Sequence, residues 1–338
     1  MEIKKNFSLK NYNTFGIEIY ADFFVSVSSV NEIKEALIFQ KNNNLPLLIL
    51  GGGSNILFTQ PFKGLVLHIN LLGKEILKEN TIENTLLIKV SSGENWHSFV
   101  QWCVEKDYGG LENLSLIPGK VGACPIQNIG AYGVEVKGAI HSVEAIDIET
   151  ATQISFLNKT CDFGYRNSIF KTQLKDKVII TAVNFNLSSK NHLLKISYGD
   201  ITNQLQNKKK PTIQEISNAV IAIRKSKLPD YTILGNAGSF FKNPIISIEE
   251  FELLKLIFPA IVNYPTKVGI KLAAGWLIEN SGWKGKSIGK VAVHNQQSLV
   301  LVNLGNAQGI DVLNLSKAIQ KDVYTKFKLV LETEVNIL

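Results

Sequence analysis

Hydrophobic residues in the first half of the chain fall mainly into short runs bounded by Gly, Asn or Lys. Short apolar runs with such borders are typical of buried strands. From Val183 to Leu187 apolar residues alternate with Asn, which predicts a strand with one buried and one exposed face. The other strands are expected at 47–50, 65–69, 86–90 and 143–148.

Helical spacing of apolar residues follows several capping sequences. In each of them Ser or Thr stands three positions before Glu, so that the two side chains can accept each other's backbone N–H groups. The pairs are Ser29 with Glu32, Thr212 with Glu215, and Ser247 with Glu250. Further helices are expected near 94–106 and in a long stretch from Val312 to Val323.

A change from strand-rich to helix-rich sequence divides the chain near residue 205. We place the main boundary at the Lys208–Pro211 loop, just before a capping sequence. A length of 338 residues is enough for two domains, and 45% hydrophobic with 19% charged residues excludes a disordered or fibrous protein. The pattern indicates an α+β protein with a smaller α/β part at its C-terminal end.

The composition favours a cytoplasmic protein. No apolar run approaches the ~20 residues of a membrane-spanning helix, and the first residues lack the apolar core of a signal peptide. Cys103, Cys124 and Cys161 are widely spaced and odd in number, which excludes a disulfide framework and a CxxC metal site. We therefore expect no membrane insertion and no metal.

The charge balance of +7 comes from 36 basic and 29 acidic residues. The lysines are dispersed, which argues against a nucleic-acid partner and leaves a modest preference for anionic ligands. Arg166 and Arg224 are the only arginines. Both are therefore candidates for a role that needs a planar guanidinium. The alternative is that either arginine is present by chance and has no such role.

Two glycine-rich segments are candidates for ligand binding. Gly51-Gly52-Gly53-Ser54-Asn55 lies between apolar runs and can expose successive N–H groups to a phosphate, with an ordinary hairpin turn as the alternative. It lacks the GxGxxG spacing of a Rossmann fold and is not a Walker A loop. The segment 117–133 holds four glycines, two prolines, Gln127 and Asn128, which predicts a stiff loop whose bare backbone lies against a flat ligand.

Two further segments hold candidate polar groups. Arg166 lies in Phe163-Gly164-Tyr165-Arg166-Asn167-Ser168, and Ser239 lies between Gly238 and two phenylalanines. The second segment has no GxSxG pattern, so that a hydrolase nucleophile is not expected. Taken alone, Ser239 fits a turn cap.

Together the four segments resemble the family of UDP-N-acetylenolpyruvoylglucosamine reductases, and the similarity extends from Asn13-Thr14-Phe15-Gly16 to Leu331-Glu332-Thr333-Glu334-Val335. The resemblance implies an FAD-binding fold of the vanillyl-alcohol oxidase/p-cresol methylhydroxylase type in two subdomains, followed by a smaller α/β substrate-binding domain. The implied divisions are 1–70 and 71–205 for the two FAD-binding subdomains, 206–325 for the substrate domain, and 326–338 for a strand that carries Glu334. Residues 263–276 resemble the subtype that closes a tyrosine over the substrate.

The resemblance also implies the roles of individual residues. Arg166 would bind and polarise the substrate carboxylate, Ser239 would protonate carbon, and Glu334 would act as an acid near the same carboxylate. For Arg224 a structural ion pair is expected. The implied substrate-binding residues are Tyr198, Lys227, Asn243, Tyr264 and Lys271. Thr333 and Asn336 depart from the family pattern of Pro and Arg, and the first departure could loosen the last strand.

The implied cofactor is FAD, with NADPH as co-substrate, a UDP-linked amino sugar as substrate and a monomer as the active form. The implied FAD-binding residues are Gly51, Gly52, Gly53, Ser54, Asn55, Pro118, Gly119, Gly122, Ala123, Pro125, Gln127, Asn128, Gly130, Ala131, Tyr132 and Gly133. The alternative is an FAD-dependent oxidase or dehydrogenase of a hydroxy acid or sugar on the same fold. Such an enzyme needs a base near the flavin, and all five histidines lie outside the four segments.

Overall fold

The computed structural model describes residues 1–206 and 208–338, which form two compact units. Unit 1 comprises residues 1–7, 22–52 and 63–226, and unit 2 comprises 8–21, 53–62 and 227–338. No helix among the described residues is long and apolar enough to cross a membrane. The two compact units differ from the four-segment division expected from the sequence, because residues 8–21 and 53–62 belong to the C-terminal unit. The four-segment division stays a proposal about domains.

The first sheet of unit 1 supports the first glycine-rich segment. Its strand order is β1-β2-β5-β3, with β3 and β5 parallel, and α1 (Val30–Asn42) packs its buried residues Ile33, Ala36 and Leu37 against the sheet. The strands are β1 (Lys4–Ser8), β2 (Tyr20–Val27), β5 (Phe62–Ile69) and β3 (Leu47–Leu50). The glycine-rich segment begins where β3 ends.

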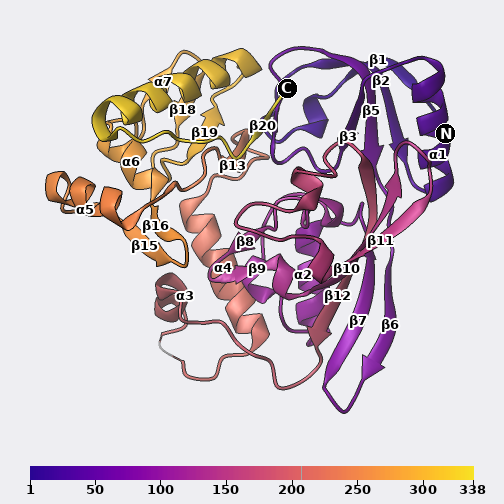
Figure 1. Ribbon diagram of the computed structural model, residues 1–338, viewed down its shortest axis with the longest axis horizontal. Coiled ribbons are helices and arrows are strands. Elements are labelled where there is room, and N and C mark those ends of the chain that lie inside the picture. The colour runs from indigo at the N-terminus through magenta and orange to yellow at the C-terminus, as the bar shows by residue number, and fades with distance from the viewer. Residues whose placement is uncertain (207) are drawn as a thin grey trace. The chain divides into compact units, whose positions relative to one another are not determined.

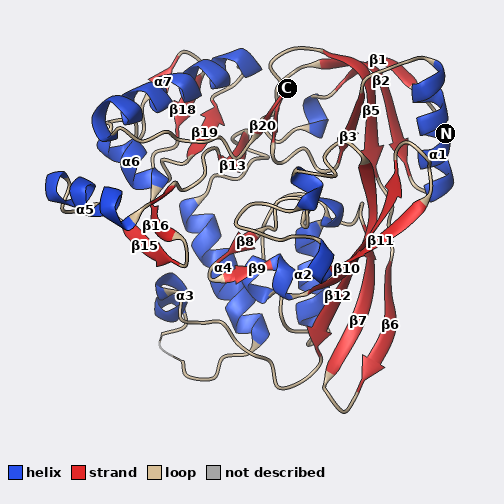
Figure 2. Cartoon of the chain, viewed as in Figure 1, coloured by secondary structure: helices blue, strands red, loops and turns tan. Residues whose placement is uncertain are grey.

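The second sheet of unit 1 is larger and fully antiparallel, in the order β11-β10-β12-β7-β6. Helix α2 (Trp96–Glu105) covers one face of it, and Trp96 and Phe99 pack with Phe185 in a common core (Figure 1, Figure 2). The strands are β11 (Gln153–Leu157), β10 (Ile140–Asp147), β12 (Val178–Ser188), β7 (Thr85–Ser91) and β6 (Lys74–Asn80).

Strand β12 corrects the expectation of one buried and one exposed face. Asn184 is buried, and its amide donates to Ser142 Oγ at 2.9 Å and to Glu144 Oε1 at 3.1 Å. The strand is central in the sheet and residues 178–185 are buried on both faces. The polar residue is tolerated inside because its neighbours on β10 satisfy its hydrogen bonds.

The expected helix caps are present. Ser247 and Glu250 form a complete capping box at α5 (Ile248–Ile257), and Thr212 with Glu215 does the same before α4 (Ile213–Lys227). At α1 the hydroxyl of Ser29 accepts the Glu32 N–H, but the Glu32 carboxylate accepts the N–H of Ser28 instead. The remaining short elements of unit 1 are β8 (Gly130–Ala131), β9 (Val134–Glu135) and α3 (Gly199–Gln204).

Unit 2 is built around the long helix α7 (Gly309–Phe327), which packs on β18 and β19 with α6 beside it (Figure 1). The main sheet has the order β13-β19-β18-β17, and a smaller one has the order β14-β16-β15. The elements are β13 (Asn236–Ser239), β14 (Ile245–Ile246), β15 (Asn263–Thr266), β16 (Gly269–Leu272), α6 (Ala274–Asn280), β17 (Ser287–Ile288), β18 (Val291–Val293) and β19 (Val300–Asn303).

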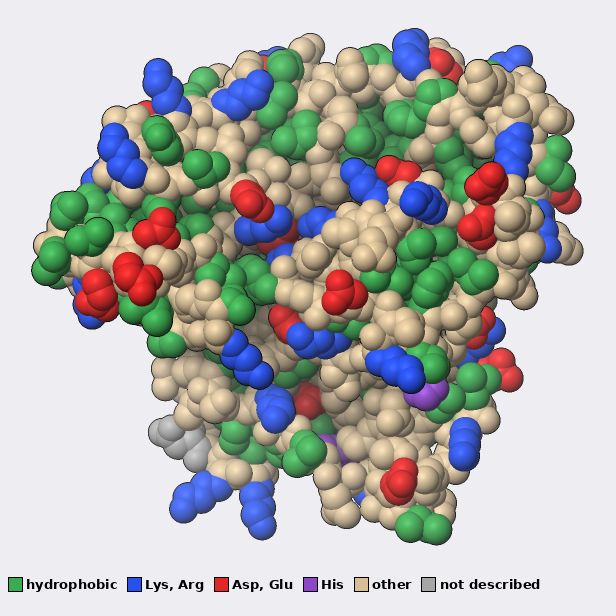
Figure 3. All heavy atoms as spheres, viewed as in Figure 1, with side chains coloured by type: hydrophobic (Ala, Val, Ile, Leu, Met, Phe, Trp, Pro, Cys, Tyr) green, Lys and Arg blue, Asp and Glu red, His purple; other side chains and the backbone are tan. Residues whose placement is uncertain are grey.

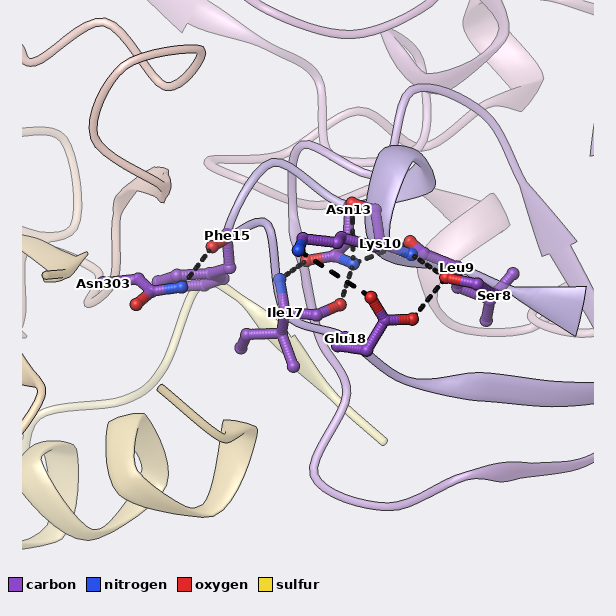
Figure 4. Close-up of polar contacts among 8 residues, drawn as sticks. All are labelled: Ser8, Leu9, Lys10, Asn13, Phe15, Ile17, Glu18 and Asn303. Carbon is purple, nitrogen blue, oxygen red and sulfur yellow. Dashed lines mark hydrogen bonds and ion pairs between the residues drawn. The ribbon is translucent and has the colours of Figure 1, made fainter. Parts of the chain in front are cut away.

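Two early segments complete the core of unit 2. Phe15, Ile17 and Leu57 are buried among the residues of β18, β19 and α7. The loop that holds them is fixed by Asn13, whose amide bonds the backbone of Leu9 and Ile17, and Asn303 donates to the carbonyl of Phe15 at 2.9 Å (Figure 4). The C-terminal residues also join this core, because β20 (Asn336–Ile337) pairs in parallel with β4 (Ile56–Leu57).

The contact between α7 and the segment 53–62 allows no side chain at Gly309. A Cβ built there would lie 1.7 Å from the carbonyl oxygen of Phe58, so we expect Gly309→Ala to lower the free energy of unfolding by about 1–3 kcal/mol. Urea unfolding followed by circular dichroism measures the change. Gly138→Ala is the matched control, because its Cβ meets no atom within 4 Å. Equal stability of the two variants would show that the segment does not pack against α7 as described.

Candidate active site

The two glycine-rich segments meet in unit 1. A Cβ built on Gly52 would lie 3.0 Å from Gly119 Cα, so that a side chain there would push the two backbones apart by a few tenths of an ångström. The second segment is anchored beside the end of β7, where Val121 N–H donates to Glu94 O and Gly122 N–H donates to Ser92 O, each at 2.9 Å. The structure therefore brings together Gly52 and Gly119, which lie 67 positions apart in the sequence.

The bare backbone at this meeting point is suited to an anion. Within the described part of the chain, the backbone N–H groups of Gly52, Gly119 and Lys120 donate no hydrogen bond. Neighbouring N–H groups without internal acceptors form a concavity that binds phosphate oxygens. This arrangement fits the predicted phosphate site in the first segment, and that role stays a prediction.

Lys120 and His68 stand beside these glycines. The Lys120 ammonium donates to Gly93 O at 2.8 Å, and a Cβ built on Gly51 would touch the Lys120 stem at 3.5 Å. His68, on β5 beside Leu50 of β3, pairs its Nδ1 with Ser26 Oγ at 2.9 Å. Burial, with a smaller contribution from the Lys120 cation, lowers the pKa of His68 to about 4.

The end of the second segment forms strand β8 and the turn of the β8–β9 hairpin, with Tyr132 and Gly133 at the turn. Asn128 is fully buried and holds the hairpin, because its amide donates to Gly164 O at 3.0 Å and its Oδ1 accepts the N–H of Lys137. The side chain of Asn128 is therefore fully used in hydrogen bonds within the protein. The predicted contact between Asn128 and the flavin stays a prediction, and it concerns the backbone of this residue. Pro125 and Gln127 lie in the turn before it.

Arg166 lies against the same hairpin. Its Nη2 donates to Gly130 O at 3.0 Å, and its guanidinium stands 5.6 Å from the centre of the Tyr165 ring. The backbone of Arg166 has a φ of +53°, in the left-handed region that residues with a side chain rarely adopt. This uncommon backbone conformation turns the arginine toward the glycine-rich hairpin.

A second arginine joins the residue before the segment 117–133 to a tyrosine near the end of that segment. Arg224 Nε donates to Leu116 O at 3.2 Å, and its guanidinium also bonds the phenol of Tyr132. The N–H of Leu116 donates to His97 Nδ1 at 2.9 Å. The expected ion pair of Arg224 is therefore wrong: its partners are a carbonyl and a phenol, and α4 delivers the guanidinium to a place where no described carboxylate pairs with it.

Ser239 and Glu334 come together in unit 2. Ser239 ends β13, and the next residue, Phe240, accepts the N–H of Glu334 at 2.8 Å. The first glycine-rich segment also reaches this place, because Asn55 Nδ2 donates to Glu334 O at 3.2 Å. Gly53 and Ser54 precede Asn55 in this unit. The candidate proton donor, the candidate acid and part of the predicted cofactor loop thus share one hydrogen-bonded region.

The departures from the family pattern do not leave the last strand loose. Thr333 pairs with Phe241 as an isolated bridge, and the Asn336 side chain donates to Asn55 O at 3.0 Å. Backbone pairing on both sides of Glu334 therefore holds the segment, and neither proline nor arginine is needed for that purpose.

The predicted substrate residues are divided between the units. On β15 and β16, Tyr264 and Lys271 are paired neighbours, with the ammonium 5.8 Å from the ring centre. Asn243 Oδ1 accepts the N–H of Ala274 at the start of α6. Lys227 ends α4, and Tyr198 in unit 1 packs edge-on against Tyr132 with ring centres 5.5 Å apart.

Sequence reasoning missed three residues of the region, namely His68, Leu116 and Lys120. Lys120 was visible in the second segment as its single charged residue. His68 and Leu116 have no local signal, because their importance comes from partners that are distant in the sequence.

The depressed pKa of His68 makes stability depend on pH. Between pH 6.5 and about 4 the unfolded chain binds a proton at His68 that the folded chain excludes, so stability falls as the pH falls through this window. After allowance for partial exposure, the loss is about 1–3 kcal/mol. We expect His68→Gln to flatten the dependence in urea unfolding at pH 7, 5.5 and 4.5. His141→Gln, at an exposed position in the same unit, is the control, and an unchanged slope in His68→Gln would contradict the assignment.

Two known protein families match parts of the chain. Residues 229–338 match the family model of the UDP-N-acetylenolpyruvoylglucosamine reductase C-terminal domain, and residues 21–155 match that of an FAD binding domain. These matches confirm the expected fold class of an FAD-binding part followed by a separate C-terminal domain. The exposed N–H groups at Gly52, Gly119 and Lys120 fit the diphosphate of FAD.

Relatives match over the full length of the chain. A UDP-N-acetylenolpyruvoylglucosamine reductase of Flavobacterium johnsoniae is 51% identical, with all of both chains covered, and one of Pseudomonas aeruginosa is 44% identical, with 100% of this chain and 99% of that one covered. The crystal structure of the Thermus caldophilus reductase (MurB) superposes with a TM-score of 0.67 at 25% identity and covers 99% of this chain and 98% of that chain. The chain therefore belongs to the family of UDP-N-acetylenolpyruvoylglucosamine reductases and is an oxidoreductase with FAD as its cofactor.

Proposed function

We propose that the chain reduces UDP-N-acetylglucosamine enolpyruvate to UDP-N-acetylmuramate with NADPH, in peptidoglycan synthesis. The observation that supports this reaction best is the hydrogen bond from the Glu334 N–H to the carbonyl oxygen of Phe240, the residue that follows Ser239. A hydroxyl and a carboxyl group on adjacent segments suit a reaction that must both deliver a proton and manage a carboxylate.

Arg166 would stabilise the charge that develops on the substrate. FAD held by the two glycine-rich segments would supply the hydride chemistry, with hydride from NADPH delivered to the enolpyruvyl methylene carbon. The substrate carboxylate then gains negative charge, and stabilising such charge is usually the largest catalytic contribution. A guanidinium matches two carboxylate oxygens better than an ammonium does, which favours Arg166 over the abundant lysines.

Ser239 would then donate its proton to the substrate carbon. An enediolate-like carbanion is basic enough to accept a proton from a hydroxyl group, although the hydroxyl is a weak acid. Glu334 would assist near the same carboxylate by donating a hydrogen bond. The hydrogen bonds that join residues 240, 334 and 55 would keep the two groups in a fixed relation.

The remaining candidates would bind the UDP-linked part of the substrate. Lys227 and Lys271 suit the diphosphate as point charges, and Tyr198 and Tyr264 can hydrogen-bond phosphate while their rings lie against sugar or uridine. Tyr264 is 45% exposed on the edge strand β15, where a tyrosine that closes over a ligand would begin. We place the enzyme in the cytoplasm as a monomer that binds no nucleic acid, and Figure 3 shows its basic side chains interspersed with acidic ones.

A flavin spectrum separates this reaction from the alternative oxidase or dehydrogenase. We expect yellow protein that bleaches with NADPH and recovers its colour anaerobically only with the enolpyruvyl substrate. Reduction of the flavin by a hydroxy acid or sugar, without NADPH, would favour the alternative. Protein that cannot be reconstituted with FAD would refute both.

Arg166→Lys tests the carboxylate site. We expect the variant to retain FAD and to be reduced by NADPH normally, while substrate-dependent reoxidation slows by about 10²–10³-fold, because lysine keeps the charge and loses the two-pronged geometry. Stopped-flow absorbance measures each half-reaction separately. Lys159→Arg, at an exposed site in the same unit, is the control. Unchanged turnover of Arg166→Lys would remove Arg166 from the carboxylate.

Ser239→Ala tests the proton donor. The change is small, so we expect the flavin spectrum and the reduction by NADPH to be preserved, while reoxidation by substrate falls by about 10²–10⁴-fold. Slow protonation by solvent should also erode the stereochemistry of the lactyl product. Ser281→Ala, whose hydroxyl bonds only the helix carbonyl of Leu277, is the matched control. Impaired reduction by NADPH with normal reoxidation would assign Ser239 to the nicotinamide site.

A further inference from the structure

Lys120 is the single charged residue in the segment 117–133. Its side chain is half-buried, and its ammonium has one hydrogen-bond partner among the described residues, the carbonyl oxygen of Gly93 at 2.8 Å. Burial lowers the pKa of Lys120, and the field of Glu94 opposes that shift. A half-buried cation with only a neutral carbonyl beside it leaves much of its charge uncompensated.

The acidic residue whose field acts on Lys120, Glu94, does not neutralise it. Glu94 accepts from Lys74 Nζ at 2.9 Å and from the N–H of Gly73 at 2.8 Å, so both of its carboxylate oxygens are engaged. No ion pair within 4 Å joins Lys120 to a described carboxylate. The carboxylate contributes a field at a distance but no contact.

His68 neither adds to the charge of Lys120 nor offsets it, because its imidazole is neutral. Its pKa of about 4 means that the imidazole carries no charge near neutral pH, and the nearby Lys120 cation is one cause of that low value. The hydrogen bond between Nδ1 and Ser26 holds the ring in place. Because the ring is neutral, it does not attract an anion as a second cation would. The local charge is therefore that of one ammonium.

The ammonium stands beside a backbone that presents hydrogen-bond donors. The stem of Lys120 runs along Gly51, the Gly52 backbone meets Gly119, and the N–H groups of Gly52, Gly119 and Lys120 have no acceptor in the described chain. Gly51, Gly52 and Gly119 carry no side chains, so a ligand can approach these N–H groups closely. Donor groups and one cation at the same place complement a group with several anionic oxygens.

We propose that Lys120 is a binding residue for the diphosphate of FAD, with its ammonium as the cation that complements the backbone N–H groups of the two glycine-rich segments. The inference rests on the FAD-binding domain and is independent of the proposed reaction with the enolpyruvyl substrate. It adds a side-chain charge to a site that otherwise consists of bare backbone.

Binding of flavins that differ in phosphate content tests this role. Apoprotein is titrated with FAD, FMN or riboflavin, and the dissociation constant is measured by flavin fluorescence. Lys120→Gln removes the charge and keeps an N–H donor, on a side chain that is one bond shorter. We expect it to weaken FAD binding by about 10- to 100-fold, to weaken FMN binding less, and to leave riboflavin binding unchanged.

Two further variants control the measurement. Lys120→Met removes both the charge and the hydrogen bond to Gly93. We expect it to bind FAD as Lys120→Gln does but to be less stable. This result would separate the effect of the lost hydrogen bond from the effect of the lost charge. Lys63→Gln makes the same change of net charge on a lysine that is 78% exposed and should bind all three flavins as the unmodified chain does.

Two results would overturn the proposal. One is FAD binding by Lys120→Gln that equals that of the unmodified chain, and the other is an equal loss of affinity for FAD and riboflavin, which would indicate a purely structural lysine. Failure of the proposed reaction is recognised separately, because it would appear as an unmodified chain that binds FAD tightly but does not reoxidise with the enolpyruvyl substrate.

Discussion

The backbone of Leu116 is held at both of its polar atoms, and the cofactor region of unit 1 depends on that restraint. His97 accepts its N–H, and Arg224 donates to its carbonyl oxygen. Leu116 has a φ of +58°, a left-handed conformation that costs about 1–3 kcal/mol for a residue with a side chain. Both restraints are needed because a leucine would otherwise leave this conformation and carry Pro118 and Gly119 away from Gly52.

The same arginine extends this restraint to the hairpin that touches Arg166. Arg224 bonds Tyr132 at the hairpin turn, and Gly130 at the start of the hairpin accepts from Arg166. The chain uses lysine for nearly all of its cations, and its two arginines each make contacts that a single ammonium reproduces poorly. One organises the backbone of the site, and the other is the candidate for the substrate carboxylate.

Local features of this protein could be predicted from the sequence, whereas long-range pairings could not. The capping boxes at Thr212 and Ser247 and the strand at 47–50 depend on neighbouring residues, and they appear as expected. The clamp on Leu116 joins residues that are 19 and 108 positions apart, and no periodicity encodes such distances. Asn184 was misjudged for the same reason, because its partners on β10 decide whether an amide can be buried.

The composition of unit 2 has a consequence for how the chain folds during synthesis. Phe15 and Leu57 leave the ribosome long before α7 and Val335, which belong to the same core. These early apolar residues must wait for nearly the whole chain, and contacts with such large sequence separation slow folding. A fragment that begins at residue 227 would lack part of its own core. Unit 2 can therefore be completed only after residue 335 has been synthesised, whereas most of unit 1 is available to fold before that point.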